Sequence, residues 1–61
     1  MWIKNLYGDY VNMDRASYVY TNYDGCTCVS VDDCEYEIAK GDIREDVIAT
    51  IISGAKVMEV R

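Results

Sequence analysis

Two tight-turn signals in the middle of the chain constrain its fold more than any other feature. Asp24-Gly25 is typical of a two-residue β-hairpin turn, whose central residues both need a positive φ. Asp32-Asp33 is a weaker signal of the same kind. Three stretches rich in β-branched and aromatic side chains adjoin these turns, at residues 17–23, 26–31 and 34–39. The sequence therefore predicts three consecutive antiparallel strands.

The register implied by these turns gathers apolar side chains on one face of the three strands. Tyr20 is expected opposite Val29, and Val29 opposite Tyr36, with side chains alternating between the two faces. The predicted core face carries Tyr18, Tyr20, Thr27, Val29, Val31, Cys34, Tyr36 and Ile38. The predicted outer face carries Val19, Thr21, Cys26, Cys28, Ser30, Glu35 and Glu37. Two independent turn assignments thus agree on one apolar face.

The same register separates the three cysteines. Cys34 is expected in the core as a small buried hydrophobe, whereas Cys26 and Cys28 fall on the outer face. The three thiols then cannot converge on one metal ion, and the chain has no His. Residues two apart on one strand also lie too far apart for an easy disulfide. We expect reduced thiols, no metal site and no cofactor; a redox or interface role of Cys26 and Cys28 stays open.

The N-terminal part of the chain predicts another hairpin. Residues 1–6 and 10–13 flank a Gly-containing turn at 7–9. Both alternating sets of side chains in this hairpin contain large apolar residues. Such a strand either is central in a layered fold or is pressed against a partner chain.

The C-terminal part predicts one helix, at about residues 43–53. Ile and Val recur there at helical spacing, Asp42 is a suitable N-cap, and Gly54 a suitable C-terminal stop. Residues 56–60 form either a short final strand, within or between subunits, or a segment packed under the helix end. The expected fold is α+β and a single domain, residues 1–61: an antiparallel sheet of four to five strands, a β-meander, with the helix packed on one face.

Composition and charge narrow the function. The net charge of −5 and pI near 4.3 argue against general nucleic-acid or anionic-membrane binding. No apolar stretch approaches the ~20 residues of a membrane span, and the first residues lack a signal-peptide pattern, which favours a cytoplasmic location. There is no Gly-rich phosphate loop and no His-based catalytic set. We therefore expect a non-enzymatic protein with no catalytic residues.

Binding to another protein is the function class that remains. Carboxylates would steer a partner with a basic surface toward the chain, and exposed tyrosines would supply contact area. In one form of this hypothesis the carboxylates mimic the phosphates of DNA. The candidate partner-binding residues are Asp32, Asp33, Glu35, Glu37, Tyr7, Tyr10 and Tyr23. Self-association is the alternative, since an exposed sheet or edge can pair with its own copy; a homo-oligomer, with a dimer favoured, is expected.

The opening residues 1–14, MWIKNLYGDYVNMD, resemble the start of short uncharacterised phage and prophage proteins of Gram-positive bacteria. The order of strands followed by a C-terminal helix is also similar to that of flagellar FlbD-like proteins. The first resemblance implies a mobile-element setting in a host bacterial cytoplasm. It implies an inhibitor of a host defence or nucleic-acid-handling protein, a class that includes anti-CRISPR proteins. The alternative is a self-assembling structural or accessory protein of phage or flagellar type.

Overall fold

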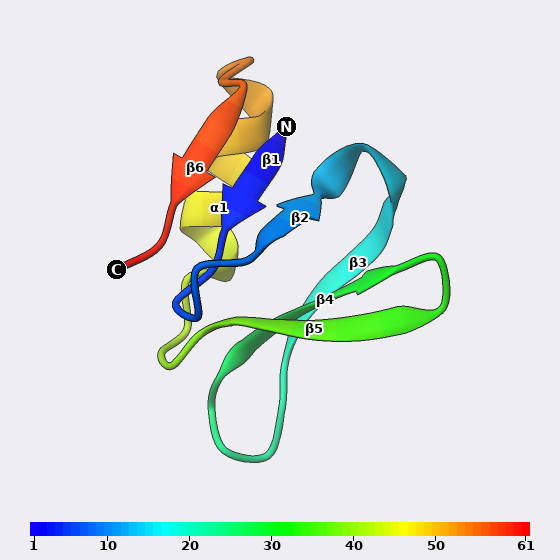
Figure 1. Cartoon of the computed structure of the whole chain (residues 1–61). Helices are drawn as coiled ribbons and strands as arrows, with labels where there is room; N and C mark the ends of the chain where they lie inside the picture. Colours follow the sequence, from blue (N-terminus) through cyan, green and yellow to red (C-terminus); the bar gives the residue numbers. More distant parts are fainter.

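Two three-stranded sheets and one helix make up the computed structural model, which describes all residues 1–61 (Figure 1). The fold is therefore α+β, as predicted, but its six strands do not form the expected single sheet. In chain order the elements are β1 (Trp2–Lys4), β2 (Tyr10–Asn12), the 3-10 helix η1 (Met13–Arg15), β3 (Ala16–Thr21), β4 (Thr27–Val31), β5 (Cys34–Ala39), α1 (Arg44–Ile52) and β6 (Val57–Glu59).

The first sheet has the strand order β2-β1-β6. β1 and β2 form the predicted N-terminal hairpin, and the predicted final strand exists as β6. β6 pairs with β1 of the same chain, but in parallel, so the sheet is not a pure meander. The chain leaves this sheet at η1, where the Asn12 side chain accepts a hydrogen bond from the Asp14 N–H (3.0 Å) and Met13 is buried. This turn separates β2 from β3 and explains why two sheets form.

The second sheet has the order β3-β4-β5, and one of its two registers differs from prediction. Between β4 and β5, Val29 lies opposite Tyr36 as expected. Between β3 and β4, Val19 rather than Tyr20 lies opposite Val29, and Tyr20 lies opposite Cys28. A slip of one residue turns every side chain of a strand to the other face. Val19 therefore packs against the core, and the prediction of Tyr18 and Tyr20 on the core face is wrong.

The loop between β3 and β4 explains this slip. Asn22 N–H donates to the Cys26 carbonyl (3.0 Å), and the Asn22 side chain accepts from the N–H groups of Asp24 and Cys26 (both 3.0 Å). Three residues, not two, thus lie between the closing pair, and Gly25 takes a φ of +77°. A loop of this length with Gly in the left-handed region is a common hairpin connection. Asp24-Gly25 therefore marks the position of the turn correctly, but the loop also includes Tyr23.

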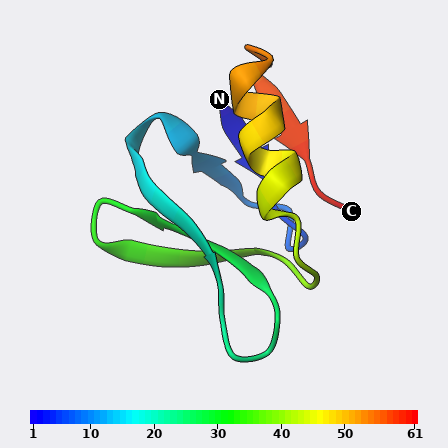
Figure 2. The same ribbon diagram turned by 180° about the vertical axis from the view of Figure 1, so that it is seen from behind.

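The core lies where the helix and both sheets meet (Figure 2). Seven buried residues form it: Ile3, Val11, Met13, Val29, Val31, Ile38 and Val47. The helix begins at Arg44, whose N–H donates to the Asp42 carboxylate (3.2 Å), and Gly54 follows its end with a φ of +80°. Only Val47 of the predicted apolar helix stripe is fully buried. The helix therefore packs on a sheet as predicted, but with only part of its apolar side.

Thr27 connects the second sheet to the start of the helix. Its fully buried hydroxyl donates to the Gly41 carbonyl (2.6 Å) and accepts from the Ile43 N–H (2.9 Å). Both backbone groups belong to the segment that leads into α1. This one side chain thereby takes the place of backbone partners that the segment lacks.

We predict that Thr27→Val destabilises the protein by about 1–3 kcal/mol, because two polar backbone groups lose their partner while the side-chain volume is kept. Urea unfolding followed by circular dichroism measures the change. Thr21→Val is the matched control, since Thr21 lies opposite Thr27 and its hydroxyl makes no hydrogen bond; we expect it to change stability by less than about 0.5 kcal/mol. Equal effects of the two substitutions would contradict the bridging role.

Candidate protein-binding face

The outer side of the β3-β4-β5 sheet gathers tyrosines and carboxylates. The observed register places Tyr18 and Tyr20 of β3, Cys28 of β4, and Glu35 and Glu37 of β5 on this side. Tyr7 from the β1–β2 loop and Lys40 after β5 join them at one end. We call the group of Tyr7, Tyr18, Tyr20, Glu35, Glu37 and Lys40 the tyrosine face.

One end of the tyrosine face is a closed set of polar contacts. The Tyr7 hydroxyl donates to the Glu37 carboxylate, and the Lys40 ammonium donates to the Tyr7 hydroxyl (3.3 Å) and to Glu37 (3.2 Å). Hydrogen bonds from Tyr7, then from the Cys26 thiol and Lys40, lower the pKa of Glu37. Hydrogen bonds to Tyr7 and then to Glu37 raise the pKa of Lys40. Both groups are thus held in their charged forms.

Asn5 positions the loop that brings Tyr7 to this end. The buried Asn5 side chain accepts from the N–H groups of Tyr7 (3.0 Å) and Asp9 (2.9 Å) and donates to the Glu37 carbonyl (3.3 Å). Leu6 N–H also donates to the Ile38 carbonyl (3.3 Å). The β1–β2 loop is therefore fastened along β5, and Tyr7 is fixed rather than free.

The other end of the tyrosine face pairs two aromatic rings. The ring centroids of Tyr18 and Tyr20 lie 5.3 Å apart with the planes tilted by 43°. The Tyr18 hydroxyl lies 3.5 Å from the Glu35 carboxylate. Hydrogen bonding to Glu35, with burial second, raises the pKa of Tyr20 to about 12. Both rings lie beside one carboxylate, so this end presents aromatic area next to a negative charge.

Cys28 and Cys34 lie on the predicted sides of the sheet, but the burial of the cysteines is the reverse of what those sides imply. Cys26 and Cys28 are buried although they belong to the outer side, because Tyr20 and Glu37 flank Cys28 on the neighbouring strands. Burial is the main cause that raises the pKa of both thiols. Cys34 is exposed although it belongs to the core side, because it begins β5 at the tip of a hairpin that extends beyond the core (Figure 1). The prediction of a buried Cys34 is therefore wrong, and Cys26 and Cys28 are covered although they lie on the outer face.

Of the seven predicted binding residues, three come together: Tyr7, Glu35 and Glu37. Tyr10 lies on the other sheet, where the Lys4 ammonium is 6.0 Å from its ring centroid. Tyr23 is fully exposed in the β3–β4 loop.

The predicted turn at Asp32-Asp33 is present, with a φ of 50° and 66° at these residues. Asp32 pairs there with Arg15 (2.6 Å), and this hydrogen bond lowers its pKa. Asp33 is exposed beside it. These two carboxylates thus lie at the hairpin tip, apart from the closed set around Glu37.

The sequence-based prediction missed Tyr18, Tyr20 and Lys40. The two tyrosines were assigned to the core by the register that proved wrong. The signal that could have found them is Asn22, whose side chain, three residues before Gly25, is suited to closing a longer loop.

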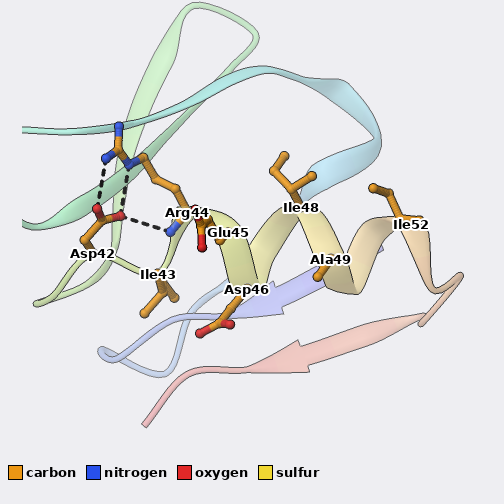
Figure 3. A pocket seen from close by; sticks show the side chains of 8 residues that line it. All are labelled: Asp42, Ile43, Arg44, Glu45, Asp46, Ile48, Ala49 and Ile52. Atoms are coloured by element: carbon orange, nitrogen blue, oxygen red, sulfur yellow. Dashed lines mark hydrogen bonds and ion pairs between the residues drawn. The ribbon is translucent and has the colours of Figure 1, made fainter.

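Two hollows of the surface lie away from the tyrosine face. One runs along the outer side of α1, where Asp42 holds Arg44 through two hydrogen bonds and Ile48 and Ile52 project (Figure 3). The other lies beside the N-terminus and is lined in part by Trp2, Ile51 and Lys56. No group of three or more His, Cys, Asp or Glu side chains converges as metal ligands do. Neither hollow is lined by a residue of the tyrosine face.

Comparison with protein-family models, with curated proteins and with solved structures found no match for this chain. The chain forms no helix with both the length and the hydropathy that a membrane-spanning segment needs.

We predict that one thiol reacts much faster than the other two. Cys34 is exposed, whereas Cys26 and Cys28 are buried and their raised pKa values leave little thiolate at pH 8. Iodoacetamide labelling of the native protein, followed by peptide mass spectrometry, should modify Cys34 first, and all three equally in urea. Rapid native labelling of Cys26 or Cys28 would contradict the observed burial of these two thiols.

We predict that the contribution of Glu37 to stability depends on pH. Because its pKa is lowered by folding, the contribution is present above the ordinary Glu pKa and is lost as pH falls through the folded value. The stability difference between the wild type and Glu37→Gln should be largest at neutral pH and shrink between about pH 5 and about pH 3. Glu59→Gln, an exposed change on the other sheet, should show no such trend in urea unfolding. A difference that is constant with pH would contradict the assignment.

Proposed function

We propose that the chain is a non-enzymatic protein-binding module that contacts a partner with a basic surface through the tyrosine face. The observation that carries this proposal is the set of three tyrosines and two carboxylates on one side of one sheet. Tyrosine combines a large apolar ring with a polar tip, which makes it a frequent anchor in interfaces.

The tyrosine face is held in place before any partner arrives. Tyr7 is fixed by Glu37 and Lys40, and Tyr18 packs against Tyr20. Both Tyr7 and Tyr18 still expose more than half of their surface. Side chains that are already ordered lose less conformational entropy on binding, so this arrangement favours affinity.

The negative net charge of the chain favours a basic partner, but ion pairs within the chain occupy some of its carboxylates. The net charge of −5 steers a positively charged protein toward the chain. Among the predicted carboxylates, however, Asp32 is paired with Arg15 and Glu37 with Lys40. Glu35 is thus the carboxylate of the tyrosine face that has no ion pair, although the Tyr18 hydroxyl lies beside it. Acidic DNA mimicry needs rows of unpaired carboxylates. These two ion pairs therefore argue against mimicry as the way in which the chain binds a basic partner.

The proposed biological setting rests on the resemblance of residues 1–14 to phage and prophage proteins. In that setting the partner is a host defence or nucleic-acid-handling protein, and the chain inhibits it by covering a basic surface. Proteins that handle nucleic acids carry such basic surfaces.

Self-association is the second candidate, and exposed apolar side chains away from the tyrosine face favour it. Trp2 and Val57 lie on the outer side of the first sheet, and three isoleucines are exposed on α1. Small monomeric proteins rarely leave large contiguous apolar patches uncovered. We therefore propose that the chain works as a homo-oligomer, with a dimer favoured. If self-association is its whole function and the tyrosine face binds no other protein, the role of the chain is structural or accessory.

We predict that Tyr18→Ala and Glu35→Lys each weaken partner binding at least about tenfold, because they remove an anchor and a steering charge. The immobilised protein is used to capture partners from a Gram-positive host lysate. Affinity for the purified partner is then measured by biolayer interferometry at several salt concentrations, and should fall as salt rises.

Tyr10→Ala and Glu59→Lys are the matched controls for these two changes, since they alter the same residue types on the other sheet. We expect them to change the affinity less than about threefold. A partner that tolerates both tyrosine-face variants but is lost with the controls would refute the assignment of the face.

A further inference from the structure

The helix α1 buries one apolar residue fully and leaves three isoleucines exposed. Ile48, Ile51 and Ile52 are 47%, 41% and 80% exposed, whereas Val47 is fully buried. Ile48 and Ile52 are four residues apart and project from the same side of the helix, away from β1 and β6 (Figure 3). We call Ile48, Ile51 and Ile52 the isoleucine ridge. The apolar stripe of α1 is thus wider than the part that packs on the core. Such a wide stripe is typical of a helix that packs on a further surface.

Charges along α1 are distributed unevenly. In the first turn the only cation, Arg44, is held by Asp42 (2.9 Å), so that Glu45 and Asp46 remain without an ion pair. The last turn contains no basic residue, but Lys56 follows it and likewise has no ion pair. One end of the ridge is therefore negative and the other positive.

This pattern complements itself when two helices run in opposite directions. An antiparallel partner helix brings its positive end beside Glu45 and its negative end beside Lys56, whereas Asp46 projects from the side opposite Ile48 and takes no part (Figure 3). A parallel partner would place acid beside acid, which is unfavourable. The helix dipoles also oppose each other in the antiparallel arrangement. A twofold symmetric dimer uses the same patch on both copies, so one self-complementary surface is enough to form it.

We propose that the isoleucine ridge is the interface of a homodimer in which α1 packs antiparallel on α1 of a second copy. This inference rests on the proposed self-association and names its surface. The three isoleucines of each copy interdigitate, and Glu45 lies near Lys56 of the second copy.

Salt distinguishes this contact from the one made by the tyrosine face. Each copy carries a net charge of −5, so two copies repel at long range, and added salt screens this repulsion. The dimer is held mainly by apolar contact and therefore persists at high salt. A contact between the tyrosine face and a basic partner weakens under the same conditions.

The experiment is sedimentation equilibrium of the purified protein over a range of concentrations. The wild type should form a reversible dimer, and Ile52→Asp should weaken its dimerisation at least about tenfold. Val57→Asp is the comparison variant, because Val57 is also apolar and 56% exposed but belongs with Trp2 to the other exposed apolar patch, on the outer side of the first sheet. If the isoleucine ridge is the interface, Val57→Asp should change dimerisation less than about threefold. Circular dichroism verifies that both variants fold.

A charge swap tests the antiparallel direction. Glu45→Lys and Lys56→Glu should each weaken the dimer, and the double variant should restore it. A monomeric wild type at every concentration would overturn both this inference and the proposed self-association. A dimer that survives Ile52→Asp but is lost in Val57→Asp overturns this inference alone, and a double variant weaker than either single one overturns the antiparallel packing. Partner capture by Ile52→Asp tests the tyrosine face separately.

Discussion

One small core covers only one side of each element, and the arrangement of the surface depends on this limit. Seven buried side chains from both sheets, η1 and α1 meet in a single cluster. A chain of 61 residues has too little material for a second layer on the far sides. The apolar and aromatic residues of those far sides therefore face solvent, as the tyrosine face, as Trp2 with Val57, and as the isoleucine ridge.

Local signals in the sequence identified the elements well, because each depends on a few neighbouring residues. The turn at Asp32-Asp33 fixes the register of β4 with β5, and the spacing of Ile and Val identifies α1. The register of β3 was not predictable from Asp24-Gly25 alone, because the Asn22 side chain adds one residue to the loop. A strand has a period of two, so this single residue exchanged the inner and outer faces.

The candidate site was predictable to the extent that it lies on β5. Glu35 and Glu37 share a face whatever strand lies beside them, because they are two residues apart. The inclusion of Tyr7 depends on Asn5 and its long-range bond to the Glu37 carbonyl, which no local pattern reveals. Tyr10 was excluded by the separation of the two sheets at η1, and Asp32 by its ion pair with Arg15. Contacts between distant segments therefore decided which of the predicted residues meet.

The positions of the two proposed surfaces make them compatible in one assembly. α1 lies on the core side of the β3-β4-β5 sheet, since Val47 belongs to the same cluster as Val29 and Ile38 (Figure 2). The tyrosine face covers the opposite side of that sheet. Two copies joined through α1 thus leave both tyrosine faces free. A dimer that presents two copies of one contact surface binds a repeated or dimeric partner more tightly than either copy alone, without any new contact.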